Sequence, residues 1–228
     1  MNLIWKPKNI TSNIKNLLGH IQCRGKDSYG ILTILPDRRW RLIKGLGEVP
    51  KDIETQLGDI SGDTSIIHTR SATNGSVSIK NAHPFLSEKN NIALSHNGII
   101  FNDDAIRVKL LEEGHIFNST TDSEVILHLF ESFWDGSTAP TSILKAWEKC
   151  VDKLSNHLNV IMMFPDSTIM GYCAPSLAYF QDKESIFLAS TPFNSTTWNT
   201  MIDGEILIAR RGEILLKDKV RTSNFFIK

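Results

Sequence analysis

Four short regions of the 228-residue sequence hold most of the side chains that can take part in chemistry. They are RGKDSYG at 24–30, HTRSATNG at 68–75 with NAHP at 81–84, HNGIIFN at 96–102, and TDSEVILHL at 121–129. A guanidinium group matches a carboxylate with two parallel hydrogen bonds, and a carboxylate accepts hydrogen bonds from an ammonium group. Imidazoles move protons, and backbone N–H groups stabilise negative charge that develops during a reaction. Each region alone is a weak signal.

Arg70, Asp122 and the Asn97–Gly98 pair also have plain structural interpretations. Arg70 and Asp122 can form an ordinary surface ion pair. Asn-Gly is a strong hairpin-turn signal, so Asn97–Gly98 can mark a turn. These alternatives stay open as long as each region is considered separately.

His68, His83 and His96 can be structural imidazoles, hydrogen-bonded inside strands or loops, and we favour this interpretation for His68 and His96. A three-histidine metal site is the alternative. The sequence has no close HxH or HExxH spacing to support it, so we expect no metal site. RGKDSYG lacks the GxxxxGK[ST] spacing of a phosphate loop, which favours a structural turn that braces a site.

Hydrophobic periodicity predicts the elements that must position these residues. Helices are expected at 10–22, after Pro50, and at 103–113, 122–134 and 141–154. Strands are expected at 2–5, 29–35, 40–44, 64–69, 92–96, 158–164, 167–173, 177–181, 185–189, 205–209 and 213–217. The polar stretch from Arg70 to Asn91 is long for a structureless loop, which indicates a functional one. Strands and helices come in blocks, which predicts an α+β fold with mostly antiparallel sheets, and residues 1–228 are expected to form one domain.

The composition excludes several classes of partner. Lys plus Arg and Asp plus Glu both total 25, so no basic excess points to nucleic acid or an anionic membrane. No apolar run approaches the roughly 20 residues of a membrane span, and the N-terminus does not resemble a signal peptide. Cys23, Cys150 and Cys173 are too few and too widely spaced for a disulfide framework, which favours a reducing, cytoplasmic setting. We expect Cys150 and Cys173 to be buried structural thiols, and we expect no cofactor.

Taken together and in this order, the four regions resemble the glutaminase domain of class II glutamine amidotransferases, and most closely the glutamine–fructose-6-phosphate amidotransferase branch. The resemblance is strong from about residue 10 to 135 and traceable to about 215, where FLAS and DGEIL resemble late strands of the family. It implies an N-terminal-nucleophile (Ntn) hydrolase fold, a four-layer αββα sandwich. In such enzymes an N-terminal cysteine thiolate attacks the side-chain amide of glutamine, ammonia leaves, and water releases glutamate.

The resemblance also implies roles for individual residues. Arg70 holds the α-carboxylate of glutamine, and Asp122, at the start of a predicted helix, holds the α-ammonium group. Asn97, through its side chain, and Gly98, through its backbone N–H, form the oxyanion hole. The remaining implied substrate-binding residues line the pocket: Thr73, His83, and Asn74, where the family usually has histidine.

The sequence departs from the family at the nucleophile. If NLIW is the first strand, Asn2 stands where the family has its cysteine, and an amide is not a competent nucleophile. Cys23 lies near the N-terminus, but the family fills that position with ordinary residues. Ser71 replaces a tryptophan of the close relatives, and the sugar-isomerase half that would use the ammonia is not expected in this chain.

Three hypotheses follow. The first is a degenerate domain that binds L-glutamine or a similar amino acid and acts as a glutamine-binding or regulatory module. The second is an active glutaminase subunit that supplies ammonia to a separate synthase, with a nucleophile that lies upstream or is unconventional. The third is a structural or interaction protein that reuses the fold. Loss of the thiol counts against the second hypothesis. Five retained residues count against the third: Arg70, Thr73, Asn97, Gly98 and Asp122.

Overall fold

The structure, a computed structural model, describes residues 2–5, 11–58, 62–73, 75–89, 91–193 and 197–220. Within these residues the strands pair into two sheets, and every pairing is antiparallel. The first sheet has the order β11 (Asn199–Thr200), β9 (Ala178–Gln181), β10 (Ile186–Ala189), β1 (Asn2–Trp5), β4 (Thr64–Arg70), β2 (Ser28–Ile34) and β3 (Trp40–Leu46). The second has the order β13 (Glu213–Lys219), β12 (Glu205–Arg210), β8 (Thr168–Tyr172), β7 (Asn156–Met163), β6 (Ala93–Ile100) and β5 (Phe85–Leu86).

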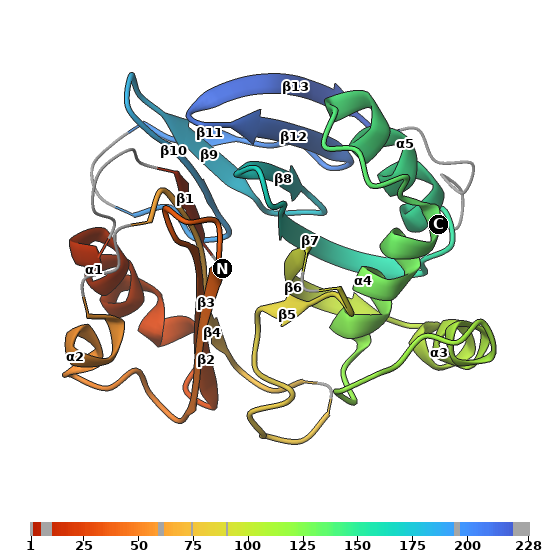
Figure 1. The fold of residues 1–228 in the computed structure, drawn as a ribbon, viewed down its shortest axis with the longest axis horizontal. Coiled ribbons are helices and arrows are strands. Elements are labelled where there is room, and N and C mark those ends of the chain that lie inside the picture. Colours follow the sequence, from red (N-terminus) through yellow and green to blue (C-terminus); the bar gives the residue numbers. More distant parts are fainter. Residues whose placement is uncertain are drawn as a thin grey trace.

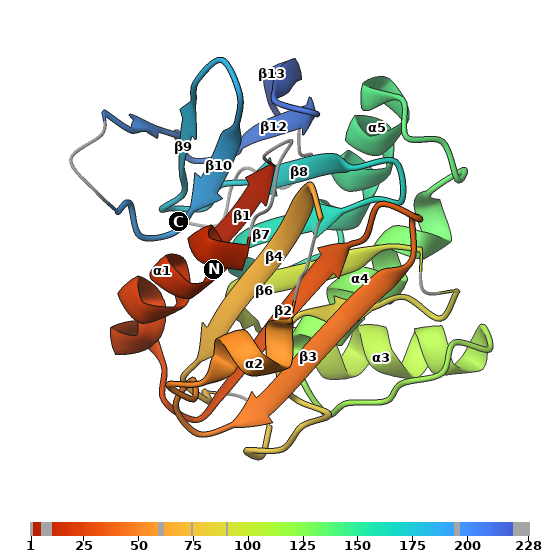
Figure 2. The same ribbon diagram turned by 60° about the vertical axis from the view of Figure 1, so that its left-hand side comes forward.

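Helices cover the outer face of each sheet (Figures 1 and 2). The first sheet carries α1 (Thr11–Ile21), the short 3₁₀ helix η1 (Gln22–Arg24) and α2 (Ile53–Leu57). The second carries α3 (Asp103–Glu112), α4 (Asp122–Phe133) and α5 (Pro140–Val151). The order of layers is therefore helix, sheet, sheet, helix, which confirms the predicted αββα sandwich. Among the described residues, no helix combines the length and apolar character that crossing a bilayer needs.

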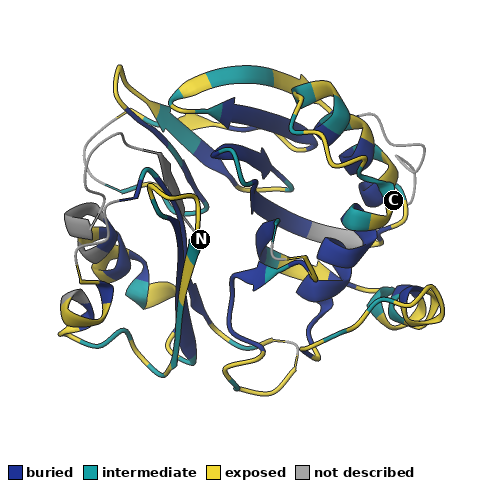
Figure 3. Cartoon of the chain, viewed as in Figure 1, coloured by how far each residue is buried: buried dark blue, intermediate teal, exposed yellow. Residues whose placement is uncertain are grey.

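Buried residues follow the strands of both sheets and much of α4 (Figure 3), and their side chains form the layers of core that this order requires. In β2, Ile31 packs toward α1 and α2, whereas Leu32 packs between the sheets. In β4, Ile67 packs on the helix side and Ile66 between the sheets. Successive side chains of a strand point to opposite faces, so a strand covered on both faces must be apolar on both. This requirement explains the adjacent apolar pairs Ile31–Leu32 in β2 and Ile66–Ile67 in β4. The polar residues of the two strands are buried as well, and Thr33 and Ser65 hydrogen-bond to each other.

The predicted helices and most of the strands are confirmed, with one informative exception in the second sheet. The strand expected at 92–96 continues through Ile100, because Asn97 and Gly98 pair with Asn159 and Leu158 of β7. Asn97–Gly98 is therefore inside a strand, and the hairpin-turn alternative is wrong. The short strands β5 and β11 were not predicted, since two residues carry no periodicity.

Candidate active site

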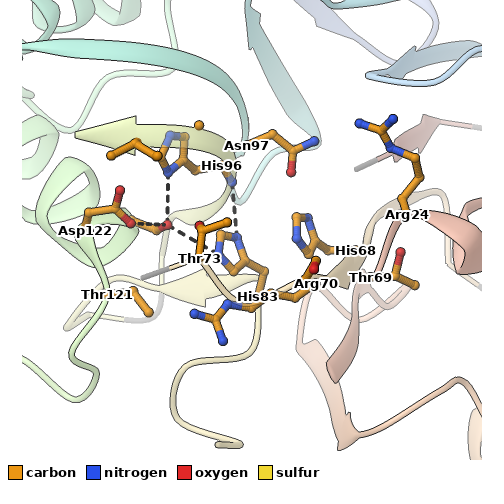
Figure 4. Close-up of a pocket in the computed structure, with 14 residues that line it drawn as sticks. Arg24, His68, Thr69, Arg70, Thr73, His83, His96, Asn97, Thr121 and Asp122 are labelled. Atoms are coloured by element: carbon orange, nitrogen blue, oxygen red, sulfur yellow. Dashed lines mark hydrogen bonds between the residues drawn. The ribbon is translucent and has the colours of Figure 1, made fainter. Parts of the chain in front are cut away.

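A cavity of about 330 Å³ lies where β4 and β6 meet the N-terminal end of α4 (Figure 4). Its lining residues are Arg24, His68, Thr69, Arg70, Ser71, Thr73, His83, His96, Asn97, Gly98, Ile99, Thr121, Asp122 and Ser123. All four regions singled out in the sequence contribute to this list. The cavity volume is that of a pocket for a small molecule.

The sheet register explains why β4 reaches the cavity. Asn2, the first residue of β1, pairs with Ile67 on one side and with Ala189 of β10 on the other. The end of β4, from His68 to Arg70, therefore extends beyond the beginning of β1 and lines the cavity. The backbone of Asn2 lies at this edge; its side chain is outside what the structure describes.

Arg70 and Asp122 bring opposite charges to the cavity from two different elements. Arg70, at the end of β4, is 6% exposed, and Asp122, the first residue of α4, is 4% exposed. Burial lowers the pKa of Arg70, and the negative charges of Asp27 and Asp122 oppose that shift. An arginine keeps its proton in proteins, so the guanidinium stays charged. The cavity thus offers one buried positive and one buried negative group, while Arg24, also in its lining, is exposed.

The carboxylate of Asp122 is fixed by two hydrogen bonds. Its Oδ2 accepts the backbone N–H of Ile100 at 3.0 Å, and its Oδ1 accepts the hydroxyl of Ser123 at 3.3 Å. The position at the helix N-terminus also favours a negative charge, because the unpaired N–H groups of the first turn face it. The fold therefore holds this carboxylate in place before any ligand arrives.

Three histidines, His68, His83 and His96, form a group that we call the cavity cluster. His83 Nδ1 accepts the backbone N–H of His96 at 3.2 Å, so the ring hydrogen of His83 is on Nε2, 3.3 Å from the Ser123 hydroxyl. His96 Nδ1 lies 3.0 Å from the same hydroxyl. The rings of His68 and His83 are stacked, with centroids 4.3 Å apart. Burial lowers the pKa of both His68 and His83 well below 6.5, so both rings are neutral near pH 7.

Both His68 and His96 are buried in strands, as the structural interpretation expects, but both also line the cavity. In the part of the chain that the structure describes, the three histidines of the cavity cluster do not bring three ligand atoms within 4.8 Å of one another. Their arrangement is that of a neutral, hydrogen-bonded pocket wall.

Asn97 and Gly98 present N–H groups at the rim of the cavity. The Nδ2 group of Asn97 donates to the hydroxyl of Ser190 at 3.1 Å. An amide nitrogen has two hydrogens, so this bond orients the group and leaves a second donor. Gly98 has a φ of 147°, a conformation that residues with a Cβ rarely adopt, so a glycine is required here.

Thr73 and His83 also line the cavity, Thr73 as an exposed residue of the loop after β4 and His83 as a buried one. Asn74 lies outside the described residues. Of the sequence-predicted site, the structure therefore brings Arg70, Thr73 and His83 together with Asp122 and the Asn97–Gly98 pair.

The RGKDSYG region braces the site, as predicted. Asp27 donates its backbone N–H to the carbonyl of Arg70, and its side-chain Oδ2 accepts the N–H of Ala72 at 2.8 Å. A Cβ at Gly25 would clash with the backbone of Arg70, and one at Gly30 would clash with the carbonyl oxygen of His83. The two glycines allow the backbone segments that carry Arg70 and His83 to approach closely.

Sequence patterns did not single out several of the lining residues, notably Arg24 and Ser123. Both lie inside regions already singled out, but a serine or an arginine in such a region has no spacing that assigns it to a pocket.

None of the lining residues is a cysteine. Cys150 and Cys173 are buried in the core, as expected, and burial raises the pKa of both thiols. Cys23 is exposed on η1, and its thiol lies 3.6 Å from the carbonyl of His20.

Comparison with known proteins gives the family. A model of the glutamine amidotransferase domain matches residues 68–192. The chain is 41% identical over 150 residues to a glutamine–fructose-6-phosphate aminotransferase (isomerizing) of Haemophilus ducreyi, a match that covers 65% of this chain and 24% of that protein. It is 30% identical over 220 residues to the protein of the same name from Buchnera aphidicola subsp. Acyrthosiphon pisum, covering 93% of this chain and 36% of that protein.

Among solved structures, the chain resembles the glutamine phosphoribosylpyrophosphate amidotransferase from B. subtilis, with a TM-score of 0.76 at 21% identity. That match covers 96% of this chain and 49% of the other and bears on the fold alone. The chain spans only 24–36% of the length of the two curated relatives described above. Because the family model matches more than half of the chain and the fold agrees, the chain belongs to the class II glutamine amidotransferase domain family, with the Ntn-type sandwich.

Proposed function

We propose that this domain binds L-glutamine, or an amino acid closely related to it, in the cavity at the start of α4. The observation that carries the proposal is the pair of buried, opposite charges of Arg70 and Asp122 on one small cavity. An amino acid carries an α-carboxylate and an α-ammonium group next to each other. Arg70 would hold the carboxylate with two hydrogen bonds, and Asp122 would accept from the ammonium group.

The remaining lining residues fit the side-chain amide of glutamine. The second Nδ2 hydrogen of Asn97 and the backbone N–H of Gly98 would donate to the amide oxygen, as donors do in an oxyanion hole. Thr73 and the neutral ring of His83 would complete the wall, and the family resemblance adds Asn74, which follows Thr73 in the sequence. Hydrogen bonds of this kind discriminate strongly, because a ligand without the amide leaves buried donors unpaired.

We further propose that binding is not followed by hydrolysis through a thiol of this domain, which then acts as a glutamine-binding or regulatory module. In this sequence Asn2 opens β1, and the cysteine side chains of the described residues are absent from the cavity lining. The amide of an asparagine cannot form the thioester that the family reaction requires.

A second candidate function is that of a glutaminase that passes ammonia to a separate synthase. The similarity to glutamine–fructose-6-phosphate aminotransferases favours it, since this chain spans only a quarter to a third of those proteins. It requires a thiol, and the described residues that line this cavity include none. The N-terminal sequence and intact mass of the natural protein would reveal a processed or upstream cysteine.

Two measurements on the purified protein test the proposal. Isothermal titration calorimetry should detect L-glutamine binding, with much weaker binding of L-norvaline, which lacks the side-chain amide. An ammonia-release assay on the same sample should give no turnover above that of a heat-treated control. Robust glutamate production would contradict binding without hydrolysis and would support the glutaminase function. Absence of binding to any amino acid would favour a structural protein that reuses the fold.

A further inference from the structure

A second group of titratable side chains lies away from the cavity, around His128 of α4. It consists of Glu88 from the turn after β5, His115 from the connection between α3 and α4, and His128 from α4, and we call it the helix cluster. One carboxylate oxygen of Glu88 and one nitrogen of each ring lie within 4.8 Å of one another. Neither the family assignment nor the proposed glutamine site uses these three residues.

The spacing of the ligand atoms in the helix cluster matches a small coordination sphere. Glu88 Oε1 lies 3.3 Å from His115 Nδ1 and 3.6 Å from His128 Nδ1. Ligands of a tetrahedral zinc ion, at bond lengths of about 2.0–2.1 Å, are about 3.3 Å apart. A metal ion would therefore fit between these atoms after small side-chain movements.

The buried nitrogens of the helix cluster face carboxylates without making hydrogen bonds of normal geometry. His128 is 1% exposed, and its Nδ1 lies 3.3 Å from Glu131 Oε2 and 3.6 Å from Glu88 Oε1. His115 Nδ1 lies 3.3 Å from the same oxygen of Glu88, again without such a bond. Buried groups of this kind call for a specific explanation, and an ion between them is one.

A second layer of contacts orients the helix cluster, as in many metal sites. A histidine that binds a metal through one nitrogen usually directs the other to a carboxylate. His128 Nε2 lies 3.7 Å from Glu124, whose carboxylate accepts the N–H groups of Asn118 and Ser119. Glu88 Oε1 likewise accepts the N–H of Ile116 at 2.8 Å. These bonds tie the segment that follows His115 to α4 and to the turn after β5.

We propose that Glu88, His115 and His128 bind one divalent transition-metal ion of the zinc class, with water or the Glu131 carboxylate as the fourth ligand. Two imidazoles and a carboxylate form a borderline donor set that suits zinc better than magnesium or calcium, which prefer oxygen ligands. The ion would join three segments that are distant in sequence, so its role would be structural. Glu88, His115 and His128 are too far apart in the sequence to form a short metal-binding motif, which is why the sequence did not predict this site.

The alternative to a bound metal ion is protonation of His128. Although burial disfavours the charged form, the Glu124 and Glu131 carboxylates raise the pKa of His128 to about 9. A protonated ring among carboxylates would satisfy the same charges without a metal. The two accounts differ in whether purified protein retains zinc through these particular side chains.

The test uses the purified chain, stripped with a chelator, incubated with zinc chloride and desalted before its metal content is measured. We expect about one zinc per chain. Glu88→Gln and His115→Ala, both outside the buried core, should each weaken zinc affinity by at least about tenfold, because even the loss of an outer-shell partner costs about 10–100-fold. His20→Ala and Glu112→Gln change exposed residues of the same types and should bind zinc like the unmodified chain. Cobalt substitution should give the intense visible absorption of a tetrahedral site.

Thermal unfolding in chelator checks that each variant folds, and added zinc should raise the melting temperature of the unmodified chain but not of His115→Ala. Loss of all zinc on desalting would overturn the proposal. So would zinc retained equally by Glu88→Gln and His115→Ala, because that result would place the metal elsewhere, for example at the cavity cluster.

Discussion

The cavity cluster and the helix cluster are two groups of histidines beside α4, and they differ in their partners. The three histidines of the cavity cluster and His128 are buried, whereas His115 is half-buried. In the cavity cluster the rings meet a hydroxyl, a backbone N–H and each other, and burial lowers the pKa of His68 and His83. In the helix cluster the rings lie among carboxylates. The same residue type thus forms a neutral pocket wall in one place and a cation-binding group in the other.

If the two groups are independent, a substitution that removes glutamine binding at the cavity should leave zinc binding at the helix cluster unchanged, and the reverse. The largest expected effect is that of Arg70→Ala on glutamine binding. It removes the guanidinium partner of the α-carboxylate, and we expect affinity to fall by a factor of about 100 or more, as for other lost partners of buried charges. Calorimetry measures the change. Arg39→Ala, at an exposed arginine, is the matched control, and zinc binding should be unchanged in both variants. Unchanged glutamine affinity in Arg70→Ala would show that the ligand binds elsewhere.

Gly30→Ala tests the close contact that supports the cavity cluster. The added Cβ would clash with the carbonyl oxygen of His83, and both backbones are buried, so we expect a loss of several kcal/mol in the free energy of unfolding. Urea denaturation measures it. Gly19→Ala is the matched control, since a Cβ there meets nothing within 4 Å in α1, and should stabilise the protein by about 0.5–1 kcal/mol. Equal stability of the two variants would contradict the described contact.

The neutral state of the cavity cluster predicts a pH dependence. The folded-state pKa of His68 and His83 lies well below the unfolded value of about 6.5. Below pH 6.5 the unfolded chain therefore binds more protons than the folded protein. The stability contributed by neutral His68 and His83 is fully present above pH 6.5. As the pH falls from 6.5 toward the folded-state pKa, the free energy of unfolding decreases by up to about 1.4 kcal/mol per pH unit for each ring.

Urea denaturation of the unmodified chain and of His68→Gln, at pH 7 and pH 5, measures this dependence. The variant should lose less stability between the two pH values, since one buried ring no longer resists protonation. An identical loss in both proteins would mean that His68 titrates normally in the fold. Exposed His20, replaced by Gln, controls for the general effect of removing a histidine.

Ser190→Ala should have the smallest effect. It removes the hydroxyl that accepts from Asn97 Nδ2 and leaves the second donor of that amide in place. We expect a loss of about 1 kcal/mol in stability and a change of a few fold in glutamine affinity. Asn97→Ala should weaken binding more strongly than Ser190→Ala. The reverse order would argue against a role for Asn97 as a donor to the ligand.

Local patterns in the sequence determined most of the secondary structure and much of the cavity. Apolar periodicity predicted the helices and most of the strands, and the order of the four regions identified the family. The family resemblance that the four regions carry together predicted Arg70, Asp122 and the Asn97–Gly98 pair as site residues, and all four residues line one cavity.

Only the tertiary structure decided which partner each buried group meets. Sheet pairing with β7 placed Asn97–Gly98 inside a strand instead of a turn. Packing brought His68 against His83, and Glu88 against His115 and His128, from segments that no local pattern connects. The physical reason is that pKa, charge pairing and metal affinity depend on neighbours in space. The sequence shows that a histidine is present, but its protonation state and role depend on whether the fold places a hydroxyl or a carboxylate beside its ring.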